Sequence, residues 1–554
     1  MTKVHATRPN EPTVRLSRWS VAYNVAFVVN LATTPFMAYL TEPLPGRIAQ
    51  VHVPEWNSFQ EYTDVMATYF HTLFNNTTMP YEVVKQDRTT NTFAERVTME
   101  IPFSIPESQV QGYISHMAGS PYFAEGVEAY MTTFLTSNAS SRAAIKPWRI
   151  CQHQCLVGIS FGEFCFWLDE VVDGVQDSNF PHYAVWVAIY PLETPQLCWF
   201  KFIFRSGVST YVLYVFWTRY YRRFGPLLHN LRTIGFGSEY MHYQVVLGDP
   251  AYAILIDPFV SFAMFVDIWC ASPYLGMAVF RVSQFQDMLS YALGCMYFSR
   301  TVWFAYLCMR GLSAVVKWRR WEAWFAPVDP GFLAICAYVY GGPMTSAIVF
   351  SPMVRLTRKS FSYFLPSALH GQVIEVSFLT ILCTLVVAHF PVVYSLAATK
   401  WNRFKQRRRL QKSHGEIVAI SFSNPAYNDI KAIILLSMVM RKHHPTCPTT
   451  GGSLHKLYHK NPRYRSMPLF SHRSADCFVV CYNADGNVAK RVRLSLLAWL
   501  DRQSRDPKLE IQLCTALHST SVCIFDDKPC SKQGWTSLDA KYIHLGDANC
   551  PWIM

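Results

Sequence analysis

Six stretches of this chain are long and apolar enough to restrict how it can fold. They are residues 20–40, 198–218, 251–280, 288–310, 331–354 and 372–397. A helix that crosses a hydrocarbon core of about 30 Å needs about 20 mostly apolar residues, and each stretch comes close to that length. The 554-residue chain is 51% hydrophobic and only 16% charged. The pattern predicts an α-helical polytopic membrane protein with about six transmembrane helices, in which 198–218 is the weakest because it contains Lys201 and Arg205.

Lysine and arginine are distributed unevenly between the flanks of these stretches. With the N-terminus placed inside, the inner flanks hold nineteen Lys and Arg residues, against four in the two short outer loops. Because positive residues favour the cytoplasmic side, both termini are expected to be cytoplasmic, in the plasma membrane or an endomembrane. The basic cluster at 355–359 runs against this bias. The first stretch is expected to be a signal anchor, and a cleaved signal peptide is the alternative.

This topology divides the chain into five parts. Residues 1–19 form a cytoplasmic N-terminus, 20–40 the first transmembrane helix, 41–197 an external α+β domain, 198–397 the transmembrane bundle, and 398–554 a small mixed cytoplasmic domain. The external segment carries 17 acidic and 7 basic residues, whereas 398–554 carries 24 basic and 11 acidic residues. Hydrophobic spacing predicts a helix over 57–75 and a strand over 93–105. A second strand is expected at 477–482, followed by a turn at 483–486.

The external segment contains the sequence's candidate modification sites. All three N-glycosylation sequons of the chain lie there, at Asn75, Asn76 and Asn138, which predicts a glycoprotein. Four cysteines, Cys151, Cys155, Cys165 and Cys198, can form one or two disulfides in an oxidising compartment, with the connectivity left open. Free thiols are the alternative.

Two ionisable residues fall inside the predicted bundle. Asp267 and Arg300 lie at similar depths in neighbouring antiparallel stretches, which predicts a buried ion pair between them. Such a pair is more often a latch between helices than an ion or proton relay. The sequence Gly341-Gly342-Pro343 interrupts the fifth stretch, as either a kink or close-packing site or the broken helix of a transporter.

The segment after the last apolar stretch is strongly basic. Its charges include Arg403, Lys405, Arg407, Arg408 and Arg409, and they are expected to face anionic lipid of the inner leaflet rather than nucleic acid. Further on, His443, His444, Cys447, His455 and His459 suggest zinc, but their spacing fits no standard ligand set, so no metal site is predicted.

Catalytic motifs give little support for an enzyme. Gly158-Ile159-Ser160-Phe161-Gly162 matches a G-x-S-x-G nucleophile elbow, but Asp173 and His182 follow too closely for that layout, so a chance match is expected. The sequence predicts no catalytic residue and no cofactor.

Three stretches, GDPAYAIL (248–255), SRTVWFAY (299–306) and YVYGGP (338–343), resemble uncharacterised multi-pass membrane protein families of oomycetes. The resemblance covers about residues 200–420 and carries no functional residue. The expected order of helices and external domain is also similar to polycystin and mucolipin channels, although the loop 355–371 is short for a pore helix and filter. The favoured function is a receptor-like or interaction protein whose external domain binds a ligand or protein. A channel or transporter using Asp267, Arg300 and the 341–343 break is the alternative.

Overall fold

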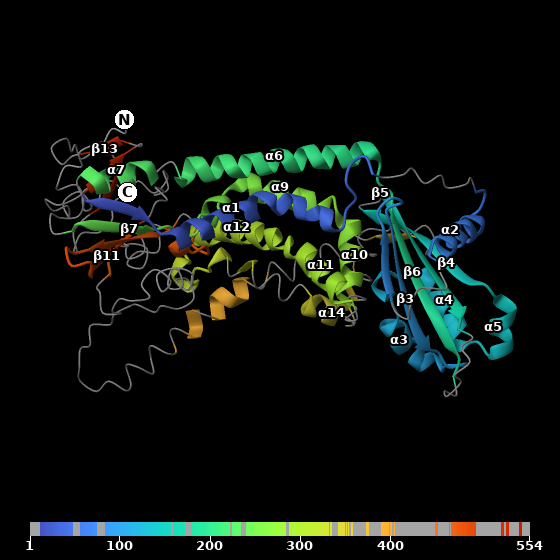
Figure 1. Ribbon diagram of the computed structural model, residues 1–554. Helices are drawn as coiled ribbons and strands as arrows, with labels where there is room; N and C mark the ends of the chain where they lie inside the picture. Colours follow the sequence, from blue (N-terminus) through green and yellow to red (C-terminus); the bar gives the residue numbers. More distant parts are fainter. Residues whose placement is uncertain are drawn as a thin grey trace.

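The computed structural model describes residues 12–47, 56–74, 83–156, 159–171, 180–221, 224–233, 240–283, 287–331 and 467–494, with shorter pieces between 333 and 465 and beyond 522. Three parts lie in a row: a six-stranded sheet flanked by helices, a central group of helices, and a five-stranded sheet (Figure 1). A further three-stranded sheet is formed by β12 (Val522–Phe525), β13 (Lys528–Cys530) and β14 (Tyr542–Leu545).

The prediction of about six transmembrane helices is wrong. Among the described residues, one helix is long and apolar enough to cross a membrane, Arg18–Leu40, made of α1 (Arg18–Thr33) and the 3-10 helix η1 (Thr34–Leu40). A second candidate exists only if α9 (Pro258–Trp269) and α10 (Ser272–Ser283), which meet at 74°, count as one bent span. The two large sheets, each mixing parallel and antiparallel pairs, give the chain a mixed fold rather than an all-helical one.

The stretch 251–280 fails as a single span because it is both broken and buried. The short helix α8 (Ala251–Leu255) has its C-cap at Ile256, and Asp257 then caps α9, accepting hydrogen bonds from the backbone N–H groups of Phe259 and Val260 at 2.9 and 3.1 Å. All of α8 and almost all of α10 lie in the protein interior. An apolar helix suits a protein core as well as lipid, so hydropathy alone could not separate the two.

The last three predicted spans are also divided or only partly described. The stretch 288–310 contains α11 (Met288–Ser299) and the start of α12 (Val302–Arg319), with a break at Arg300. In 331–354 the described pieces include α14 (Pro343–Val349). The stretch 372–397 begins with a strand, β8 (Val373–Glu375).

The six-stranded sheet forms the core of the predicted α+β segment. Its strands, in spatial order, are β2 (Val83–Asp87), β3 (Thr92–Glu100), β6 (His182–Pro191), β5 (Ile159–Glu170), β4 (Trp148–Leu156) and β8. All neighbours are antiparallel except β8, which pairs with β4 in parallel. Because β8 comes from beyond residue 370, the sheet is not completed within 41–197.

Helices cover both faces of this sheet (Figure 1). The predicted helix 57–75 is observed as α2 (Phe59–Phe74), whose buried face packs on the stacked rings of Trp167 and Trp186. On the opposite face, α3 (Glu107–His116) and α4 (Glu125–Thr136) share a hydrophobic core with Phe164 and Val185. The sheet is therefore a rigid support with both faces occupied.

Two helices connect the two sheets through the central bundle. α1 leaves the five-stranded sheet, and α6 (Pro195–Arg219) returns to it from the end of β6. Polar contacts hold both helices at this end. Asn24 Nδ2 of α1 donates to the Gly248 carbonyl at 2.9 Å, and Arg219 at the end of α6 pairs with the buried Asp257 at 2.6 Å.

The five-stranded sheet joins segments from the whole length of the chain. Its order is β1 (Thr13–Leu16), β7 (His242–Val246), β10 (Cys477–Tyr482), β11 (Val488–Leu494) and β9 (Thr449–Gly451). The predicted strand 477–482 is β10. At Gly248 a Cβ would lie 2.3 Å from the Asp476 carbonyl oxygen, so only glycine permits this approach between β7 and the C-terminal segment.

Candidate functional site: a buried ion-pair network

Six charged side chains meet inside the bundle, at its end next to the six-stranded sheet. Three are acids and three are bases, and each side chain is at most 6% exposed. They are Glu42, Glu193, Lys201, Arg205, Asp267 and Arg300, and we call them the ion-pair network.

Glu42 is the centre of the network and lies just after η1. Its Oε2 is 2.7 Å from Nη2 of Arg205 and 3.7 Å from Nζ of Lys201, while Oε1 is 3.5 Å from Nη1 of Arg300. The Tyr297 hydroxyl donates to the same Oε1 at 3.1 Å. One carboxylate therefore contacts all three bases.

Asp267 of α9 closes the network on the other side. Its Oδ1 is 2.8 Å from Nε of Arg205, and its Oδ2 is paired with Nη2 of Arg300. The two acids and two arginines thus form a closed ring in which each charge touches two opposite charges. The ring of Tyr39 packs against the Arg205 guanidinium and that of Tyr297 against Arg300, each 4.9 Å from ring centroid to guanidinium carbon.

The network also reaches the six-stranded sheet. Glu193, two residues after β6, pairs with Lys201 and accepts a hydrogen bond from the Tyr274 hydroxyl of α10. Asn91, in the turn between β2 and β3, donates from Nδ2 to Tyr274 Oη at 2.8 Å and to the Pro191 carbonyl at 3.2 Å. A continuous chain of polar contacts therefore runs from the sheet into the bundle.

This arrangement is suited to holding the two parts in one relative position. Burying a charge costs several kcal/mol unless it is paired, so all six groups stabilise the fold only as a complete set. Removing one member of a buried pair typically costs about 3–5 kcal/mol, because its partner is left uncompensated. The acids and bases balance in number, and every carboxylate has a base beside it, which favours a latch over an ion pathway.

The structure brings the predicted pair Asp267 and Arg300 together, but as part of a larger set. Glu42 and Glu193 were not predicted from the sequence, and Lys201 and Arg205 were interpreted only as a weakness of the apolar stretch 198–218. Lys201 and Arg205 are four residues apart on an otherwise apolar helix, so they lie on one face. Two charges on the buried face of a helix require acidic side chains opposite them, so this spacing could have predicted the acidic partners.

The break at Gly341-Gly342-Pro343 is a packing site in the described part of the chain. A Cβ on Gly342 would lie 2.4 Å from the hydroxyl oxygen of Tyr291 and 2.6 Å from Sγ of Cys295, both on α11. Pro343 is the first residue of α14, where its missing N–H is tolerated. Gly341 lies outside the described residues.

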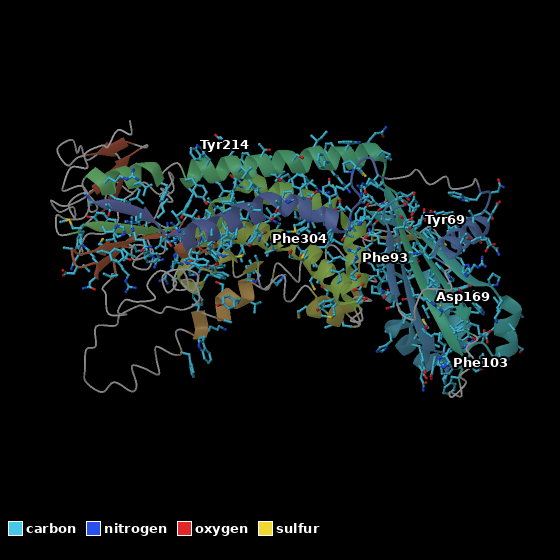
Figure 2. All side chains as sticks on the ribbon, in the orientation of Figure 1. Tyr69, Phe93, Phe103, Asp169, Tyr214 and Phe304 are labelled. Atoms are coloured by element: carbon cyan, nitrogen blue, oxygen red, sulfur yellow. A yellow bond between two sulfur atoms is a disulfide. The ribbon has the colours of Figure 1, made fainter. Side chains whose placement is uncertain are left out.

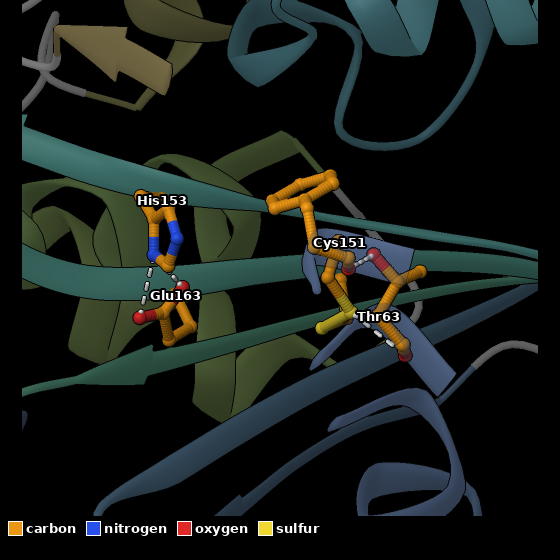
Figure 3. Close-up of a disulfide and its surroundings, with 6 residues drawn as sticks. Thr63, Cys151, His153 and Glu163 are labelled. Carbon is orange, nitrogen blue, oxygen red and sulfur yellow. Dashed lines mark hydrogen bonds and ion pairs between the residues drawn. A yellow bond between two sulfur atoms is a disulfide. The ribbon is translucent and has the colours of Figure 1, made fainter. Parts of the chain in front are cut away.

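Two of the four external cysteines are joined. Cys151 of β4 and Cys165 of β5 face each other in the antiparallel register and form a disulfide, with Thr63 of α2 against it (Figure 3). Cys155 and Cys198 are buried free thiols. The disulfide fits an oxidising compartment.

A histidine–glutamate pair lies beside this disulfide (Figure 3). His153 Nδ1 is 2.9 Å from the Glu163 carboxylate, and the Tyr62 ring stacks on the imidazole with centroids 4.8 Å apart. The hydrogen bond to Glu163 raises the pKa of His153, whereas burial raises the pKa of Glu163. No local sequence pattern predicts this pair, because His153 lies on β4 and Glu163 on β5.

Of the other candidate site residues, Asn138 and Ser160 lie in the described part of the chain and the rest lie outside it. Asn138 is exposed and caps α5 (Ala139–Ile145), accepting the Ser141 N–H with Oδ1 at 2.8 Å. Ser160 lies within β5 rather than on a turn before a helix, so the geometry of a nucleophile elbow is not present there. Three sets lie outside the described residues: the sequons at Asn75 and Asn76, the basic residues Arg403, Lys405, Arg407, Arg408 and Arg409, and the His/Cys group at 443–459.

Comparisons with known proteins give no relative. The chain matches no protein family, no curated protein and no solved structure. The resemblance to oomycete membrane proteins therefore stays a prediction.

Proposed function

We propose that this protein is a membrane-anchored interaction protein, held in a bilayer by α1, whose α+β domain presents the sheet end far from the bundle to a protein partner. The helix Arg18–Leu40 is the candidate anchor, and its apolar segment is only 17% buried within the protein. An apolar helix left so exposed is stable when lipid surrounds it.

The observation that carries the proposal is an apolar patch at that far end. β3 and β5 end there and β4 and β6 begin there, since Glu100 pairs with His182 and Trp148 with Leu168. Phe103, Ile145 and Phe180 adjoin these strand ends and are 38%, 45% and 47% exposed. Figure 2 places Phe103 at this end and Phe93 beside the bundle. We call the three residues the distal patch.

The distal patch has a firm support. Arg142 of α5 is fully buried behind it, donating to the carbonyls of Phe134 at 3.0 Å and Ile101 at 3.2 Å. Its guanidinium also packs on the Phe103 ring, 4.6 Å from the centroid. Rigid exposed aromatic residues are typical anchors of protein interfaces, since little side-chain entropy is lost on binding.

The surroundings of the distal patch indicate the chemistry of the partner. Glu100, Asp169 and Glu170 lie at the same sheet end with side chains 41–49% exposed. The whole segment 41–197 has an excess of ten acidic residues. We therefore propose a partner with an apolar centre and a basic rim, whose binding weakens as salt rises.

The proposed orientation places the α+β domain outside the cytoplasm. Basic residues before and at the start of α1 favour a cytoplasmic N-terminus: Lys3, Arg8, Arg15 and Arg18. The Cys151–Cys165 disulfide favours an oxidising compartment for the sheet. Asn138 is then available for glycosylation. A channel or transporter function has less support, because the ion-pair network is internally paired.

Site-specific photo-crosslinking on the full chain tests the interaction. A photoreactive phenylalanine analogue at Phe103 or Phe180 should crosslink one defined protein, whereas the analogue at Ile159, which is 66% exposed at the opposite end of the sheet, should not. With that protein purified, the double variant Phe103→Ser, Phe180→Ser should weaken binding by roughly tenfold or more, and Ile159→Ser should leave it unchanged. Equal crosslinking at all three positions, or equal binding by both variants, contradicts the proposal.

A further inference from the structure

The long helix α6 has its polarity reversed relative to a helix on a water-soluble surface. Its two internal charges, Lys201 and Arg205, point into the bundle and are buried. Its outward positions carry large apolar side chains that are 49–67% exposed: Trp199, Phe200, Ile203, Leu213, Tyr214 and Trp217. Figure 2 shows Tyr214 on the outer side of α6, while Phe304 lies inside the bundle.

The outward face of α6 is free of charge along its length. Between Trp199 and Trp217 the other exposed positions are Gly207 and Thr210. In water, such a face would be an unfavourable apolar patch, and the buried charges would cost still more. Apolar side chains outside and paired charges inside are favourable when the helix is surrounded by lipid rather than water.

The length of this face matches a bilayer. Trp199 and Trp217 are separated by 18 residues, which corresponds to about 27 Å along a helix axis. A hydrocarbon core is about 30 Å thick, and tryptophan is enriched at both of its boundaries. Mean hydropathy does not detect this, since Lys201 and Arg205 count against the helix although they face inward.

The neighbours of α6 extend the same surface. α1, which packs beside α6, buries Ser20 and Asn24 and exposes Val25 and Val29. α9 packs on α6 as well, with the Phe259 ring 4.9 Å from that of Tyr211, and it exposes Phe259 and Phe262.

We infer that the outer face of α6, together with the exposed positions of α1 and α9, is a contact surface for lipid acyl chains. The ion-pair network then has a second consequence: it removes the charges of α6 from the lipid side. The inference rests on the proposed attachment through α1 and adds a second helix that contacts the bilayer core.

Lipid photolabelling of the full-length protein tests this surface. The protein is placed in nanodiscs of phosphatidylcholine that carries a diazirine in the middle of its acyl chain, and labelled peptides are identified by mass spectrometry. We expect adducts on α6 around Ile203, Leu213 and Tyr214 and on α1 around Val25 and Val29. Phe103 and Phe180 of the distal patch serve as controls and should carry none.

The outcomes separate this inference from the proposed function. Adducts on α1 without α6 overturn the inference and leave the anchor in place, whereas adducts on neither helix overturn both. Disulfide formation between two copies of the variant Leu213→Cys, in place of lipid adducts, shows that a second molecule covers the face, which also overturns the inference.

A matched pair of variants tests the same surface. Leu213→Glu places a charge on the proposed lipid face and should lower the yield of acyl-chain adducts on α6 by roughly tenfold or more, while α1 keeps the protein in the membrane. Phe103→Glu places the same charge on the distal patch and should not change that yield. Equal adduct yields on α6 in both variants contradict the inference.

Discussion

His153 and Glu163 make the stability of the α+β domain depend on pH. Both groups have a pKa above the ordinary value in the folded protein, His153 through its hydrogen bond to Glu163 and Glu163 through burial. A raised folded pKa gives stability that is complete below the unfolded pKa and is lost as pH rises through the folded pKa. For His153 that loss begins above about pH 6.5, and Glu163 acts in the same direction from about pH 4.5 upward.

We therefore expect the melting temperature of the full-length protein to fall between pH 6 and pH 8, as measured by tryptophan fluorescence in detergent. His153→Gln should remove the contribution of His153 and so reduce this dependence, while the contribution from the burial of Glu163 remains. The control is His182→Gln, since His182 is more exposed and lies 3.7 Å from Glu100. A pH profile that is the same in wild type and His153→Gln contradicts the assignment.

Charge reversal in the ion-pair network gives a second prediction at the residue scale. If Asp267 and Arg300 formed an isolated pair, exchanging them as Asp267→Arg, Arg300→Asp would restore the attraction. In the observed network the new arginine would face Arg205 and the new aspartate would face Glu42. We expect the double variant to be at least as unstable as Asp267→Asn, which should lose about 3–5 kcal/mol.

Size-exclusion chromatography of the full chain in detergent measures the folded fraction of these variants. The exposed pair Lys146–Glu170 is the matched control, because exchanging two charges that are 50% and 41% exposed should change stability by less than about 1 kcal/mol. Recovery of the folded fraction in the double variant would show that Asp267 and Arg300 act as a pair alone.

Only part of the ion-pair network could be predicted from the sequence. Asp267 and Arg300 were found because charges stand out in apolar stretches and their depths matched. Glu42 was missed because it lies just outside the first apolar stretch, and Glu193 because it lies in a polar loop. Glu42 contacts Arg205 and Arg300, which are 163 and 258 positions away along the chain, and no local pattern encodes such contacts. Glu193 contacts Lys201 and Tyr274, which are 8 and 81 positions away.

At the scale of elements, apolar spacing identified α2 in 57–75, a helix that buries one face. A continuous apolar run identified β10, which is buried along its whole length. The spans failed where apolar residues are buried on all sides, as in α8 and α10. An apolar sequence indicates only that a helix is shielded from water. It does not distinguish a protein interior from lipid, because both exclude water.

The pairing of strands could not be predicted from the sequence either. Each strand was predicted from its own residues alone, without its partners. In the structure, β8 joins the six-stranded sheet from more than 200 residues beyond β4, and the five-stranded sheet joins β1 to β7 and β10. Strand partners are set by tertiary packing, so the predicted domain boundaries at 41–197 and 398–554 could not include these additions.

At the scale of the whole molecule, the two sheets lie at opposite ends of the bundle, so an anchor through α1 separates them (Figure 1). The ion-pair network fixes the α+β domain to the bundle on one side, and the Asn24–Gly248 contact joins α1 to the end of β7 on the other. If α1 and α6 cross the bilayer as proposed, the two sheets lie in different compartments.

Glycosylation reports which sheet is outside. Asn138 is exposed, its Oδ1 is engaged in capping α5, and its Nδ2 is the atom that receives an N-linked glycan. In cells that glycosylate secreted proteins, treatment with an endoglycosidase should lower the apparent mass of the wild-type protein. The variant Asn138→Gln should lose one glycan, whereas an engineered sequon at Asp485, in the exposed turn between β10 and β11, should gain none. Because the disulfide, the acidic surface and the distal patch all lie in the same domain as Asn138, a glycan at the engineered site instead would place the partner-binding end in the cytoplasm and reverse the orientation of the whole molecule.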